Sequence, residues 1–108
     1  MPAAARSGGN DTVFSLTGAG RGCNSPVRTV TGAASQSSVF IGGVPAVVFG
    51  DRVGYHLPSG CNPLGDTSTL STCSGTVLID GKGVGRIGDE YGPDNTITSG
   101  YSTVFIGG

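Results

Sequence analysis

The sequence has no tryptophan, a single histidine and few charged residues, which make up 12% of the chain. Its 6 basic and 7 acidic residues nearly cancel, leaving a net charge of −1. Phosphate neutralisation needs clustered Lys and Arg, so this balance argues against nucleic acid as the main partner. A small β-rich surface with so little charge tends to associate through its strand edges, and we expect a partner that covers them.

Long apolar runs and helical periodicity are also missing. No run approaches the length of a membrane span, and Met1–Arg6 lacks the apolar core of a signal peptide, so any export is expected to use another machine. No segment repeats apolar residues at the spacing of a helix face for long enough to form one. The 21 glycines point the same way, because each interior Gly costs a helix about 1 kcal/mol.

The apolar residues that are present occur in short bursts of Val, Ile, Phe and Tyr, separated by Gly, Asn, Asp, Ser and Pro. This pattern is typical of strands joined by many turns, and it predicts an all-β chain. A length of 108 residues corresponds to one domain.

One strand–turn–strand unit recurs along the chain. Residues 77–89 align with residues 39–51, which lie 38 positions earlier (39 to 77), with an aliphatic triplet, a Gly turn and a closing Gly-Asp in register. A third copy is split, since residues 104–108 supply its first half and residues 3–9 its second half. The repeat is therefore cyclic. It predicts three hairpin units around a pseudo-threefold axis, with the two termini meeting in one unit.

The segments between the units are polar loops rich in Gly and Pro. They cover residues 10–33, 52–69 and 90–96, and the first contains a short expected strand at 13–16. All three leave their unit after the closing Gly-Asp or its equivalent. We therefore expect the loops to gather at one end of the body and the hairpins to form the other end.

Three short motifs, Ala-Ala-Ala-Arg at 3–6, Pro-Ala-Val-Val at 45–48 and Gly-Val-Gly-Arg at 83–86, occupy equivalent places before a Gly-Gly or Gly-Asp pair. In this arrangement the whole chain resembles the PAAR-repeat family, whose members form the pointed tip of the membrane-piercing spike in type VI secretion systems and contractile phage tails. The resemblance implies a single PAAR-type domain over residues 1–108, shaped as a small cone whose loops converge on a sharp tip.

The same resemblance implies a non-enzymatic, structural role at the tip of a phage tail or injection apparatus. The protein would either be part of a virion or be assembled in a bacterial cytoplasm and expelled. One copy would cap the blunt end of a trimeric β-helical spike of the VgrG type and would meet a target-cell membrane transiently. The machine is expected to be either a phage tail or a secretion system. The residues expected to meet the spike are the three triplets and two equivalent arginines: Val39, Phe40, Ile41, Val77, Leu78, Ile79, Val104, Phe105, Ile106, Arg6 and Arg86.

Family members commonly hold a zinc ion in the tip through three His and one Cys. Here the resemblance carries His56 over, five residues after Asp51, and Cys23 and Cys61 stand near other ligand positions. Cys73 or Asp94 would be the fourth ligand. Thiolate and imidazole suit a closed structural zinc site, with iron as an alternative. A Gly-rich vertex buries little apolar surface, so a metal would hold its shape.

Two other interpretations of the cysteines stay open. Cys23 and Cys61 could form a disulfide, although His56 would then have no evident role. Cys73 stands where Gly100 stands in the next unit, so it could be a small buried residue at a strand start.

The paired carboxylates Asp51 and Asp89 raise the question of catalysis. An Asp that follows Gly at the end of a strand more often accepts backbone N–H groups in a turn, and no Ser lies in a nucleophile-elbow motif. We therefore expect turn chemistry. The alternatives to a spike tip are a free-standing β domain that binds a surface glycan, and a small metallohydrolase using Glu90 or Asp94.

Overall fold

A computed structural model describes residues 1–15, 27–54, 68–92 and 95–108. Within these ranges all regular secondary structure is β-strand, which confirms the all-β prediction. None of the described residues belongs to a helix that could cross a membrane. The strands are β1 (Ala3–Ala4), β2 (Thr12–Ser15), β3 (Val27–Val30), β4 (Phe40–Ile41), β5 (Val44–Pro45), β6 (Leu78–Ile79), β7 (Lys82–Gly83), β8 (Glu90–Tyr91), β9 (Asn95–Ile97) and β10 (Tyr101–Phe105).

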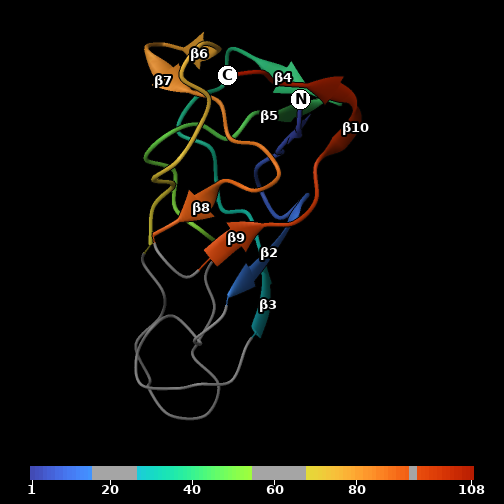
Figure 1. The fold of residues 1–108 in the computed structure, drawn as a ribbon, viewed down its shortest axis with the longest axis vertical. Helices are drawn as coiled ribbons and strands as arrows, with labels where there is room; N and C mark the ends of the chain where they lie inside the picture. The colour runs from blue at the N-terminus through green and yellow to red at the C-terminus, as the bar shows by residue number, and fades with distance from the viewer. Residues whose placement is uncertain (16–26, 55–67, 93–94) are drawn as a thin grey trace.

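The three predicted hairpin units are present as three two-stranded antiparallel sheets. These pair β4 with β5, β6 with β7, and β1 with β10. The last pair joins the two ends of the chain, and Figure 1 shows both termini at the end of the molecule where the other hairpins lie. The cyclic repeat inferred from the sequence is therefore a closed ring of three units in space.

The turns of the first two hairpins have the backbone conformation that their sequences demand. Gly42 and Gly43 have φ values of 61° and 83°, and Asp80 and Gly81 have 52° and 79°. Positive φ at both central residues defines the type I′ turn, whose twist matches that of the flanking strands. Asp80 is the one non-glycine residue of the described chain with positive φ, and Asp tolerates this region better than most residues.

A ring of backbone hydrogen bonds lies on the pseudo-threefold axis. The N–H of Ala5 donates to the carbonyl of Gly85 (3.0 Å), Gly85 donates to Val47 (2.8 Å), and Val47 donates back to Ala5 (3.3 Å). These three residues hold equivalent places in the three units. Gly85 lacks a side chain because a Cβ there would come within 3.0 Å of Leu70 and 3.3 Å of Val47.

A second ring of hydrogen bonds repeats the same symmetry two residues further along each unit. Ser7 donates to Pro45 (3.1 Å), Phe49 to Gly83 (2.9 Å), and Ile87 to Ala3 (3.0 Å). Each unit therefore donates to its neighbour and accepts from the other. The two rings explain why the paired segments within each hairpin are short, since the second segment of every unit turns to bond with the next unit.

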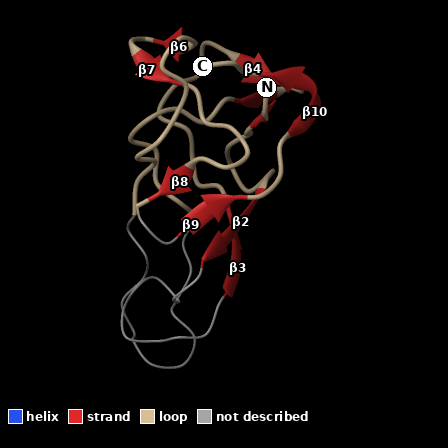
Figure 2. Cartoon of the chain, viewed as in Figure 1, coloured by secondary structure: helices blue, strands red, loops and turns tan. Residues whose placement is uncertain are grey.

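The remaining strands form one four-stranded sheet of order β3-β2-β9-β8. Strands β2 and β3 are the outgoing and returning arms of the first loop, and β8 and β9 are those of the third. The expected strand at 13–16 is confirmed up to Ser15. Figure 2 shows the hairpins and the two termini together at the top of the view, with this sheet below them. The described parts of these two loops thus extend away from the hairpin turns, as the sequence predicted.

Two apolar clusters make up the core of the described part of the chain. Strand alternation divides neighbouring residues between them, so that Ala4 belongs to the first and Ala5 to the second. The first cluster lies among the hairpins and contains Ala4, Ile41, Ala46, Val48, Ile79, Val84 and Ile106. The second links the hairpin units to the four-stranded sheet and contains Ala5, Val13, Val47, Val53, Leu70, Tyr91 and Ile97.

Candidate functional site

The three apolar triplets have the same pattern of exposure. Their middle residues, Phe40, Leu78 and Phe105, are 54%, 54% and 53% exposed. Their last residues, Ile41, Ile79 and Ile106, are 6%, 8% and 8% exposed and belong to the first core cluster. Successive side chains of a strand point to opposite faces, so each triplet buries one residue and presents the next. Near-identical values in three units indicate three nearly equivalent contact surfaces.

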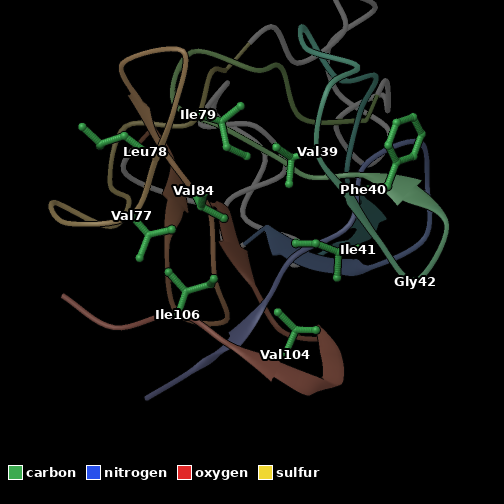
Figure 3. Close-up of a pocket in the computed structure, with 10 residues that line it drawn as sticks. All are labelled: Val39, Phe40, Ile41, Gly42, Val77, Leu78, Ile79, Val84, Val104 and Ile106. Atoms are coloured by element: carbon green, nitrogen blue, oxygen red, sulfur yellow. The ribbon is translucent and has the colours of Figure 1, made fainter.

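Between the triplets the structure contains an apolar hollow of about 350 Å³. Figure 3 shows its lining side chains arriving from all three units, with Phe40 and Leu78 on opposite outer sides. Every lining side chain is aliphatic or aromatic, and one glycine completes the wall. The lining residues are Val39, Phe40, Ile41, Gly42, Val77, Leu78, Ile79, Val84, Val104 and Ile106.

This hollow, with the exposed triplet residues that line it, forms what we call the apolar face. Eight of the nine triplet residues expected to meet a partner line the hollow, and the ninth, Phe105, is half exposed. Contiguous exposed apolar surface of this kind marks a site of contact with another macromolecule. Its side chains supply no acid, base or nucleophile, so the face is suited to packing.

The two arginines expected beside the triplets brace the hairpin units. Arg86 Nε lies 2.9 Å from Asp89 Oδ2, and its Nη1 donates to the carbonyl of Gly107 (3.2 Å). Arg6 Nη2 lies 2.9 Å from Asp11 Oδ1, and its guanidinium carbon lies 5.3 Å from the ring centre of Tyr101. The hydrogen bond to the aspartate raises the pKa of each guanidinium. Contact of either arginine with a partner stays a prediction.

Asp51 and Asp89 do the turn chemistry expected of them. The carboxylate of Asp51 accepts the backbone N–H of Val48 (3.0 Å) and of Ser35 (3.1 Å). That of Asp89 accepts the N–H of Arg86 (2.8 Å). Both aspartates are buried, and their oxygens hold the backbone where each unit turns toward its loop. This confirms the expected turn chemistry of both aspartates.

Three residues that matter to this arrangement were not singled out from the sequence. Asp11 is the equivalent carboxylate of the third unit and accepts the N–H of Arg6 (2.6 Å). Tyr101 packs against Gly42, where a Cβ would come within 2.6 Å of its ring, and so links the third unit to the first. Tyr91 is fully buried in the second cluster, and its hydroxyl has no hydrogen-bond partner in the described structure.

Of the expected metal ligands, only Cys73 falls in the described part of the chain. Cys23, His56, Cys61 and Asp94 lie outside the described residues. Cys73 has a free thiol that is partly buried, packs against the second cluster and contacts Gly83. Among the described ranges no group of three or more His, Cys, Asp or Glu could hold a metal ion. The zinc site and the alternative disulfide therefore both stay predictions.

The geometry defines a class of protein: a pseudo-threefold ring of β-hairpins that presents one apolar face of matching symmetry. A family model, described as the PAAR motif, matches residues 22–92, which are 71 of the 108 residues. The chain belongs to the PAAR-motif family. This is a structural family of spike tips in injection machines of the type VI secretion and phage type, and its members associate with VgrG-type spikes. No curated protein and no solved structure matches the chain.

Proposed function

We propose that the chain is a non-enzymatic cap, one copy of which closes the blunt end of a trimeric β-helical spike. The observation that carries the proposal is the equal exposure of Phe40, Leu78 and Phe105 in three units around one axis. A face with three nearly equivalent parts fits a partner with threefold symmetry, because each part then meets the same surface of one subunit. The free end of a trimeric β-helix is such a partner.

The physical need for a cap comes from the spike. A β-helix that ends abruptly leaves unpaired backbone groups at its last strands, and three subunits leave three such edges. A single chain with three quasi-equivalent hairpins can meet all three edges by strand pairing and apolar contact. Complete burial of one Leu or Phe side chain is worth about 1.5–3 kcal/mol. Covering three half-exposed residues would therefore contribute on the order of 3 kcal/mol.

The opposite end of the molecule is proposed to hold a metal. Cys23, His56 and Cys61 offer two thiolates and an imidazole from two loops, and Cys73 or Asp94 would complete four ligands. Such a donor set suits a closed structural zinc site, with iron as an alternative. The metal would supply rigidity, because one ion would tie separate loops together where little apolar surface is available.

Co-expression with a spike of the VgrG type, followed by native mass spectrometry, tests the cap. One copy of this chain per spike trimer is expected. Phe40→Asp should weaken the complex strongly, because it places a charge in a contact that excludes water. Phe49→Asp is the matched control, since Phe49 is also half exposed (49%) and does not line the hollow. A complex with three copies of the chain, or equal loss in both variants, would contradict the proposal.

A further inference from the structure

The apolar face is concave at its centre, and a flat partner would leave that centre empty. The floor of the hollow is formed by residues of the first core cluster, among them Ile79, Val84 and Ile106. The walls are the exposed triplet residues, with Phe40 and Leu78 outermost (Figure 3). A partner that covered the hollow without filling it would leave the lining atoms without neighbours on one side. Well-packed interfaces are as dense as protein interiors, so something fills the hollow in the complex.

Water does not suit this space. An ordered water needs two to four polar partners, and every lining side chain is aliphatic or aromatic. A charged side chain is also a poor occupant, because burial without a partner of opposite charge is strongly unfavourable. The lining side chains therefore favour an occupant that is apolar and uncharged.

The symmetry and the volume of the hollow indicate what kind of occupant fits it. The lining takes residues from each of the three units, so the hollow lies where the pseudo-threefold axis passes through the apolar face. Its volume, about 350 Å³, is near the lower end of the range of roughly 300–1,000 Å³ for small-molecule pockets. That is room for a few side chains and too little for a further hairpin or helix.

We propose that the hollow receives three aliphatic side chains, one from each spike subunit, that project from the end of the β-helix along its axis. This inference rests on the proposed capping function and adds the chemistry of the partner's end. It makes the hollow a device for specificity, because a spike that carries Asp, Glu, Lys or Arg at those axial positions is rejected. The exposed middle residues of the triplets provide area around the plug.

Filling the hollow from the side of this chain separates a plugged interface from a flat one. Val39 lines the hollow and is 42% exposed, so the fold can accept a larger side chain there. Val39→Trp adds apolar surface and occupies the space. With the spike trimer that co-purifies with the wild-type chain as the probe, we expect the affinity to fall at least about tenfold. Phe49→Trp, which lies outside the hollow, should leave the affinity unchanged.

Two further variants keep the test decisive if Val39→Trp does not fold, which thermal unfolding of the isolated chain will show. Val77→Trp fills the hollow from the second unit and should weaken docking to the same extent. Val39→Ala enlarges the hollow and should weaken docking less, by about threefold to tenfold, because the plug loses contacts. If the folded Trp variants dock as tightly as the wild type while Phe40→Asp does not dock, the plug is wrong and the cap stands. If Phe40→Asp also docks normally, the capping function itself fails.

Discussion

The carboxylate of Asp11 accepts the backbone N–H of Arg6 at 2.6 Å, which is the contact that Asp51 makes with Val48 and Asp89 makes with Arg86. In the first and second hairpin units the aspartate follows its donor by three residues, and here it follows by five. Two extra residues in the third unit therefore displace the aspartate along the sequence while the fold keeps its place. All three units close with the same contact.

Asp11→Ala should lower the free energy of unfolding by about 2–3 kcal/mol, because a buried carboxylate that serves several donors is lost. Besides the Arg6 amide, Asp11 accepts from the Arg6 guanidinium (2.9 Å) and from the Ser99 hydroxyl (2.8 Å). Urea unfolding followed by circular dichroism measures the change. Asp11→Asn keeps acceptor capacity and should cost less. A loss no greater than that of a surface substitution such as Ser102→Ala would show that Asp11 is not a structural equivalent of Asp51.

The sequence was sufficient to predict the hairpins, their turns and the meeting of the termini. Strict repetition of the triplet and the turn glycines carries that information, because turn chemistry and strand alternation are local. It was insufficient for Asp11, since Gly9 holds the expected position and only the folded chain brings a residue two places later into the contact. The hydrogen-bond rings through Ala5, Val47 and Gly85 are likewise set by packing of units far apart in sequence.

The candidate site, like the fold, could be predicted from the sequence only in part. The triplets could be assigned to a partner because exposed apolar residues in a chain poor in charge need cover. The hollow between them could not be foreseen, because its volume depends on how three units are spaced around the axis. Tyr91 lies in a polar loop of the sequence, and its burial in the second cluster depends on packing with residues distant in the chain, such as Leu70 and Val13.

Tyr91→Phe should stabilise the protein at neutral pH by about 1 kcal/mol, because it removes a buried hydroxyl that has no partner in the described structure. The variant also tests a pH dependence. Burial raises the pKa of the Tyr91 phenol above its ordinary value of 10.0, and the charges of Asp51 and Asp11 raise it further. An unfolded chain releases this proton near pH 10, whereas the folded chain retains it to higher pH.

The sign follows from that difference. The stability that depends on a protonated Tyr91 is fully present below about pH 10. The free energy of unfolding then declines progressively as the pH rises further, since the unfolded state binds fewer protons than the folded state. Unfolding titrations between pH 8 and pH 11 should show a decline in wild-type stability that is smaller in Tyr91→Phe. Parallel curves for the two proteins would show that the buried phenol does not cause the decline.

Phe40→Asp, Leu78→Asp and Phe105→Asp should weaken docking on the spike to a similar extent. Their wild-type side chains are equally exposed in the three units, so each would meet the same surface of one spike subunit. Affinities from surface plasmon resonance on immobilised spike trimer are expected to agree within about threefold, which is less than 1 kcal/mol. If one substitution abolishes docking and another is silent, the partner does not contact the three units equivalently.

His56→Ala should release the proposed metal from the tip. A structural zinc site contributes on the order of 10 kcal/mol of folding free energy, so loss of one ligand should cost several kcal/mol locally and make the loops sensitive to protease. Metal content by elemental analysis, with and without a chelator, measures the first effect, and limited proteolysis measures the second. The apolar face belongs to the hairpin units, so the affinity for the spike should change much less than the protease sensitivity of the loops.

Cys73→Ser and Asp94→Asn identify the fourth ligand, because only the variant that removes a ligand should lower the metal content. Cys73 contacts Gly83 of the second hairpin, so Cys73→Ser also serves as a packing control: a change in stability with full metal content indicates a structural role. Ligation by Cys23 and Cys61 requires both thiols to be free after denaturation in the presence of a chelator. A chain without metal, in which Cys23 and Cys61 are joined by a disulfide, would overturn the metal site, and the capping function would still stand because it depends on the apolar face of the hairpin units.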